Sequence, residues 1–63
     1  MNRFIDESAK IGKNVTLGNN VVIMAGVQIG NDCLIGHNVI IHPDTKIGNA
    51  CRIDDGTIIG KKP

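Results

Sequence analysis

Two copies of one six-residue phrase follow each other in Ile29-Gly30-Asn31-Asp32-Cys33-Leu34 and Ile35-Gly36-His37-Asn38-Val39-Ile40. Each copy has an aliphatic residue, a glycine, two polar residues, a small or β-branched residue and a variable residue. The period continues in both directions without an insertion. Every sixth residue of the chain is aliphatic, at Ile5, Ile11, Leu17, Ile23, Ile29, Ile35, Ile41, Ile47, Ile53 and Ile59. A fixed period of this kind indicates a repeat architecture.

The other positions of the hexad predict its backbone. A small or β-branched residue stands two positions before each aliphatic residue, as Val27 does before Ile29. Side chains at i and i+2 of a strand point to the same face, so each hexad predicts a short strand with two inward residues. Three positions after the aliphatic residue come residues that tolerate a left-handed backbone, namely Asn14, Asn20, Gly26, Asp32, Asn38, Asp44 and Gly56. Each strand is therefore expected to end in a tight bend, and a helix is excluded because the apolar spacing is not 3.6.

Bends of the same sense at every hexad bring the chain back over itself after three strands. We predict an all-β fold, a triangular parallel β-helix of about three and a half coils with 18 residues in each coil. The predicted domain organisation is a lead-in at residues 1–4, one β-helix domain at residues 5–60 and a tail at residues 61–63.

The composition excludes several classes of function. The net charge is +1, there is no basic run, and one Phe is the only aromatic residue, so no nucleic-acid partner is expected. The chain lacks an apolar run of the roughly 18 residues that a membrane span needs. The N-terminus has no apolar signal core, and two cysteines without a CxxC spacing fit a reducing compartment. We therefore expect a cytoplasmic protein without a membrane partner.

Stacking at 18 residues sorts the outward residues of the strands into three ladders. They are Lys10, Gln28 and Lys46; Thr16, Leu34 and Arg52; and Val22, Ile40 and Ile58. The third ladder is aliphatic on the outside of the helix, where a monomer has no use for it. It predicts a contact between subunits, and the alternative is that β-branched residues are there only because they suit strands.

The two cysteines fall in one inward column, at Cys33 and Cys51. The spacing of adjacent coils is within the range of a disulfide. Inward cysteines most often act as small hydrophobic residues, and this is the interpretation that we favour from the sequence.

From Ile5 to Gly60 the hexad pattern resembles the hexapeptide-repeat proteins, whose fold is a left-handed parallel β-helix and whose commonest members are bacterial acyltransferases. The resemblance implies a homotrimer with parallel helix axes, held here by Val22, Ile40 and Ile58. It also implies transfer of an acyl group, most often acetyl, to an amino or hydroxyl group of a small acceptor such as a sugar. Acetyl-CoA would be a co-substrate, and no tightly bound cofactor is expected.

The last segment, from Asp54 to Pro63, is similar to a point inside such acyltransferases, just before further coils. The resemblance therefore implies that the chain forms the N-terminal coils of a longer enzyme. In that case the isolated chain would carry an incomplete site.

His37 is the strongest candidate for chemistry, because it occupies a bend and has Asp55 one coil further on. A carboxylate at that distance can orient an imidazole that acts as a general base. In the acyltransferases that the chain resembles, a histidine at such a bend commonly deprotonates the acceptor. We therefore take His37 and Asp55 as candidate catalytic residues. The alternative is that His37 is a solvated bend residue.

One sugar N-acetyltransferase branch of the family has its base in a His-Asp-Cys triplet. The matching place in this chain reads Asn31-Asp32-Cys33, so that base is absent. This departure favours a second hypothesis, a non-catalytic β-helix module that trimerises or supports a larger assembly.

A third hypothesis is a metal protein. Residues 36–42, with histidines at His37 and His42, are similar to a segment of the γ-class carbonic anhydrases. Five extended residues separate the histidines by up to about 16 Å, whereas each zinc ligand lies about 2.1 Å from the ion. Only two chains of a trimer could then supply both ligands. The position stacked on His42 is Met24, a poor zinc ligand, so no metal site within one chain is predicted.

Overall fold

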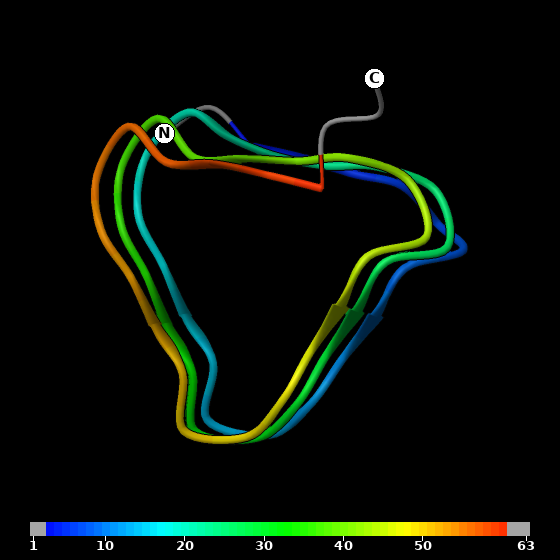
Figure 1. Ribbon diagram of the computed structural model, residues 1–63, viewed down its shortest axis with the longest axis horizontal. Coiled ribbons are helices and arrows are strands. Elements are labelled where there is room, and N and C mark those ends of the chain that lie inside the picture. Colours follow the sequence, from blue (N-terminus) through cyan, green and yellow to red (C-terminus); the bar gives the residue numbers. More distant parts are fainter. Residues whose placement is uncertain (1–2, 61–63) are drawn as a thin grey trace.

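The computed structural model describes residues 3–60, which form a left-handed parallel β-helix of triangular cross-section (Figure 1). Three parallel sheets form its walls. Wall 1 contains β1 (Arg3–Ile5), β4 (Val21–Ile23), β7 (Ile40–Ile41) and β10 (Ile58–Ile59). Wall 2 contains β2 (Lys10–Ile11), β5 (Gln28–Ile29) and β8 (Lys46–Ile47). Wall 3 contains β3 (Thr16–Leu17), β6 (Leu34–Ile35) and β9 (Arg52–Ile53).

Every strand pair has the predicted offset of 18 residues, as in the pairing of Val22 with Ile40 and of Ile40 with Ile58. The three outward ladders are confirmed by this register. The coils are residues 3–20, 21–38 and 39–56, called coils 1 to 3 below, followed by β10.

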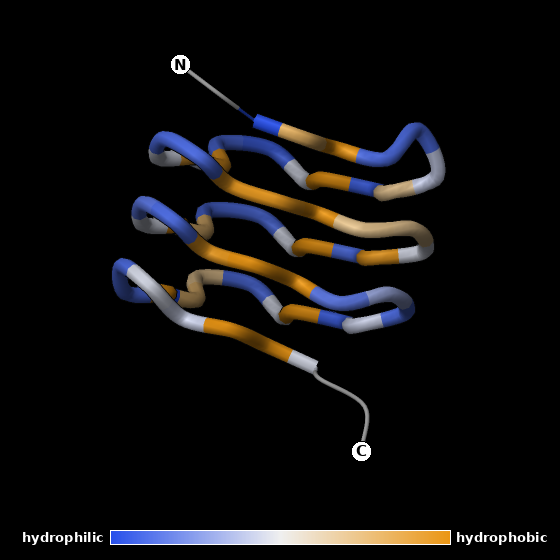
Figure 2. The backbone as a smooth tube through the Cα atoms, turned by 90° about the horizontal axis from the view of Figure 1, so that it is seen from above, coloured by the Kyte–Doolittle hydropathy of each residue, from blue (hydrophilic) through white to orange (hydrophobic). Residues whose placement is uncertain are grey.

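The first strand adds one residue to the aliphatic ladder. β1 begins at Arg3, and Phe4 lies in register with Val22. Residues 3 and 4 of the predicted lead-in therefore belong to the sheet, because Phe4 continues the outward column one coil earlier. The rest of the lead-in, residues 1–2, and the tail at residues 61–63 lie outside the described residues. Figure 2 looks onto wall 1 and shows its apolar strands one above the other.

The bends use the left-handed residues that the hexad predicts. All seven predicted positions have positive φ, from 56° at Asn38 to 76° at Gly56, and Ala50 joins them with a φ of 55°. The turn directs the amide of the left-handed residue along the helix axis. The N–H of Asn38 donates to the carbonyl of Asn19 at 2.8 Å, and that of Ala50 donates to Asn31 at 2.8 Å. The bends are thus hydrogen-bonded between coils, as the strands are.

The core is a column of inward aliphatic side chains. Its buried members are Val21, Ile23, Val27, Ile29, Cys33, Ile35, Val39, Ile41 and Ile53. Most of them belong to coil 2, because that coil is covered on both sides. The inward residues of the outer coils, such as Ile11 and Ile47, are only partly buried. Among residues 3–60 no polar or charged residue is buried.

The described part of the chain holds no helix of the length and apolar character that a membrane crossing would need.

Candidate functional site

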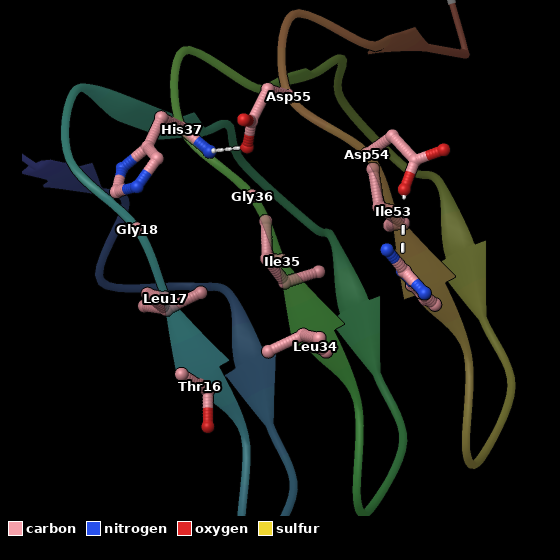
Figure 3. Close-up of a pocket in the computed structure, with 11 residues that line it drawn as sticks. Thr16, Leu17, Gly18, Leu34, Ile35, Gly36, His37, Ile53, Asp54 and Asp55 are labelled. Carbon is pink, nitrogen blue, oxygen red and sulfur yellow. Dashed lines mark hydrogen bonds and ion pairs between the residues drawn. The ribbon is translucent and has the colours of Figure 1, made fainter.

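An open groove of about 660 Å³ runs along the outside of wall 3 and reaches the bends that join wall 3 to wall 1 (Figure 3). These stacked bends, at residues 18–20, 36–38 and 54–56, are called the histidine corner below. The groove combines the half-exposed side chain of Leu34, a cation, two carboxylates and an imidazole. Its lining residues are Thr16, Leu17, Gly18, Leu34, Ile35, Gly36, His37, Arg52, Ile53, Asp54 and Asp55.

The structure brings together the two candidate catalytic residues, but not through the imidazole. Asp55 Oδ1 accepts a hydrogen bond of 2.7 Å from the main-chain N–H of His37. In Figure 3 the ring of His37 lies toward Gly18, away from this contact. The carboxylate therefore holds the backbone of the bend, and the expectation that Asp55 orients the ring is not met in this conformation. The catalytic assignment of both residues stays a prediction.

The imidazole of His37 has a contact of its own with the coil before it. Nδ1 accepts a hydrogen bond of 2.7 Å from the main-chain N–H of Asn19. An acceptor at Nδ1 requires the neutral ring with its proton on Nε2. In this conformation His37 presents an N–H donor at Nε2. Proton abstraction by His37 would require the ring to leave Asn19, because the lone pair of the ring is engaged there.

The same bond recurs at the bends between wall 2 and wall 3, where asparagine provides the acceptor. Asn31 Oδ1 accepts from the N–H of Lys13, and Asn49 Oδ1 accepts from the N–H of Asn31, both at 2.8 Å. His37 and Asp55 thus occupy positions that asparagine fills elsewhere in the helix. The glycine of the hexad makes room for this side chain. A Cβ on Gly18 would lie 2.7 Å from His37 Nδ1, which is too close for two heavy atoms.

Arg52 and Asp54 form an ion pair on the outer side of the groove, with Nε and Oδ1 3.3 Å apart. The two side chains are 77% and 79% exposed, so water screens the pair and it contributes little to stability. Both groups can therefore turn to a ligand at small cost. Sequence reasoning placed Arg52 in an outward ladder but missed Asp54. The signal was its place two residues after Arg52, at the end of the same strand.

His42 lies at the opposite end of β7 from His37, in the bends that join wall 1 to wall 2. Within residues 3–60, no group of three His, Cys, Asp or Glu side chains is placed to hold a metal ion. The two histidines of one chain are thus not brought together. The hypothesis of a metal site shared between subunits stays untested.

A left-handed β-helix made of hexads, with the bend side chains stacked from coil to coil, defines the class of hexapeptide-repeat proteins. A family model described as bacterial transferase hexapeptide (six repeats) matches residues 8–43. A second model, described as hexapeptide repeat of succinyl-transferase, matches residues 26–61. The chain belongs to the bacterial transferase hexapeptide-repeat family. A search of curated proteins gave no match.

Proposed function

We propose that the chain forms the β-helix of an acyltransferase that moves an acyl group from its CoA thioester to an amino or hydroxyl group of a small acceptor. Membership of a transferase family supports the reaction class. The observation that carries the proposal is the position of His37, at a solvent-exposed corner beside a groove that contains Arg52, Asp54 and Asp55. Acetyl is the first acyl group to test, and succinyl is the second because of the second family model.

The proposed enzyme is a homotrimer that associates through wall 1. The outward ladder of this wall is apolar in all four strands, from Phe4 through Val22 and Ile40 to Ile58. Phe4 and Ile58 are each 56% exposed in one chain. Burial of such a continuous apolar ladder favours association. The histidine corner adjoins wall 1, so in the trimer it would lie at the edge of the subunit contact, with the groove opening beside it.

The reaction needs a base, because an amine or hydroxyl attacks a thioester carbonyl only as its proton is removed. In the proposal the ring of His37 turns from Asn19 to the acceptor when the substrates bind, which frees a lone pair for that proton. The main-chain N–H of Asn19 is then left to water, at small cost because the corner is exposed. Asp55 is a positioning residue that fixes the backbone of His37.

The test compares thiol release by the wild type with release by His37→Asn, using acetyl-CoA or succinyl-CoA and an amino sugar. Asparagine can accept the Asn19 amide, as Asn31 and Asn49 do at equivalent positions. His37→Asn therefore removes the imidazole and keeps the bend. We expect a loss of turnover of about 100-fold or more, with an unchanged unfolding midpoint. His37→Ala, which loses both the ring and the bend contact, is the comparison for stability. Full turnover in His37→Asn would remove His37 from the mechanism.

The second candidate function is a non-catalytic module that trimerises and carries other parts of an assembly. The observation that favours it is the imidazole of His37, whose Nδ1 serves as a bend acceptor just as asparagine does. A trimer that releases no thiol from either CoA ester at high protein concentration would support the module and overturn the enzyme.

A further inference from the structure

Cys33 and Cys51 lie one above the other inside the helix, in neighbouring coils. Each directly precedes one member of the in-register pair Leu34 and Arg52. The N–H of Leu34 donates to the carbonyl of Cys51 at 2.9 Å, so the register holds at the cysteines themselves. Neighbouring strands are about 4.8 Å apart, which falls within the range of roughly 4.4–6.8 Å between the Cα atoms of disulfides.

The two thiols differ in exposure and lie toward the same gap between coils. Both are free, and Cys33 is only 2% exposed. Its Sγ donates to the carbonyl of Gly48 at 3.1 Å, so the sulfur of coil 2 already contacts coil 3, which contains Cys51. Cys51 is half-buried, and its one described contact is a long one, 3.7 Å to the carbonyl of Asn49. Its side chain can therefore turn toward Cys33 at small cost.

We propose that Cys33 and Cys51 form a reversible disulfide that ties coil 2 to coil 3. The oxidant is a small-molecule disulfide such as oxidised glutathione. The more exposed Cys51 loses its proton and attacks the oxidant, which releases one glutathione thiolate and leaves a mixed disulfide. Cys33 then loses its proton and attacks the sulfur of Cys51, which releases the second glutathione. Two protein thiols are oxidised, and one glutathione disulfide is reduced to two thiols.

The crosslink acts where the helix is held least. The inward residues of coil 3 are less buried than those of coil 2, as Ile47 and Cys51 show. A covalent link across an 18-residue spacing limits the freedom of the unfolded chain and keeps coil 3 against coil 2. Reducing agents return the pair to two thiols. This proposal is independent of any acyl transfer.

The experiment treats the reduced, folded chain with oxidised glutathione and follows thiol titre, intact mass and thermal unfolding. We expect both thiols to disappear, the mass to fall by two hydrogens without added glutathione, and the midpoint to rise by about 10 °C. Dithiothreitol should reverse all three. Trypsin can cleave after Lys46, between the cysteines, so without reduction peptides 14–46 and 47–52 should stay linked.

Cys33→Val and Cys51→Val are matched controls, because Val15 fills the same inward column one coil earlier. In Cys33→Val, glutathione should stay attached to Cys51 and the midpoint should not rise. The proposal is overturned if wild-type Cys51 keeps glutathione while Cys33 stays a thiol. It is also overturned if the oxidised chains are joined to one another on a non-reducing gel.

Discussion

Gly36 and Gly48 hold the same place in the hexad, but only Gly36 lies beneath a side chain of the next coil. A Cβ on Gly36 would meet the carboxylate of Asp55 and come within 2.7 Å of its main-chain nitrogen, whereas a Cβ on Gly48 meets nothing within 4 Å. Gly36→Ala should therefore destabilise the fold by about 2 kcal/mol through overpacking. Gly48→Ala should leave it unchanged or raise it by about 0.5 kcal/mol, because the unfolded chain loses freedom. Urea unfolding of the two variants measures the difference, and equal losses would contradict this explanation.

A second prediction at the residue scale concerns Ala50, which has a φ of 55°. A left-handed backbone costs an ordinary residue about 1 kcal/mol, and asparagine tolerates it better. Ala50→Asn should therefore stabilise the chain by roughly 0.5–1 kcal/mol, and Asn38→Ala should destabilise it by a similar amount. Thermal unfolding of both variants is the measurement. A shift of the same sign in both would show that the bend conformation is not the cause.

These residues also mark the limit of what the sequence predicts. The bends at Asn38 and Asp32 were predictable because asparagine and aspartate tolerate positive φ. Ala50 carries no such signal, and its conformation comes from the coil above, where its amide meets the carbonyl of Asn31. For His37 the 18-residue spacing predicted the neighbours Asn19 and Asp55. It did not predict which atoms meet, because the reach of each side chain decides that.

Among the elements, the bend after β1 contains a carboxylate with a perturbed titration. Asp6 Oδ2 accepts hydrogen bonds from the Ser8 hydroxyl at 2.6 Å and from the Ser8 N–H at 2.9 Å. These bonds favour the ionised form and lower the pKa of Asp6 below the ordinary value of 3.8. The Ser8 oxygen also accepts from the N–H of Gly26, at 2.9 Å, so the bend links coil 1 to coil 2.

Ser8→Ala should therefore raise the pKa of Asp6 toward 3.8, as an NMR titration of its carboxyl carbon can measure. A lowered folded pKa stabilises the fold above the unfolded pKa, and this contribution is lost as the pH falls through the folded value. The variant should lose part of the acid sensitivity of unfolding. Asp6→Asn, which cannot titrate at this position, is the control. An unchanged Asp6 titration in Ser8→Ala would refute the assignment of Ser8 as the cause.

For the whole molecule, the proposed trimer predicts different effects of one charge on two walls. Ile58 on wall 1 is 56% exposed and Leu34 on wall 3 is 47% exposed, so neither substitution by aspartate disturbs the buried core. Ile58→Asp should shift the species seen by sedimentation from trimer to monomer, because a charge is costly in an apolar contact. Leu34→Asp should leave the trimer intact. Dissociation by both variants, or a wild type that is monomeric at high concentration, would refute wall 1 as the contact.

The fold as a whole was predictable because one period determines it. The aliphatic column from Ile5 to Ile59 predicted the strands, the bends and the offset of 18 residues, and the pairing of Ile40 with Ile58 confirms it. The extent of wall 1 was not fully predicted, because Phe4 precedes the first aliphatic position and was assigned to the lead-in. The groove was missed for another reason. It arises from outward side chains of different coils, and a single hexad does not show their joint shape.

The constant offset between stacked residues makes the chain comparable to a screw thread, with a pitch that any change of length must respect. Insertion of one hexad between β4 and β7 would advance the thread by a third of a revolution and carry Ile40 and Ile58 from wall 1 to the face that Lys46 now occupies. The apolar stripe would then be broken. Duplication of a full revolution would lengthen the stripe and leave every azimuth unchanged. Changes of length in this chain are thus tolerated in whole revolutions rather than in single repeats.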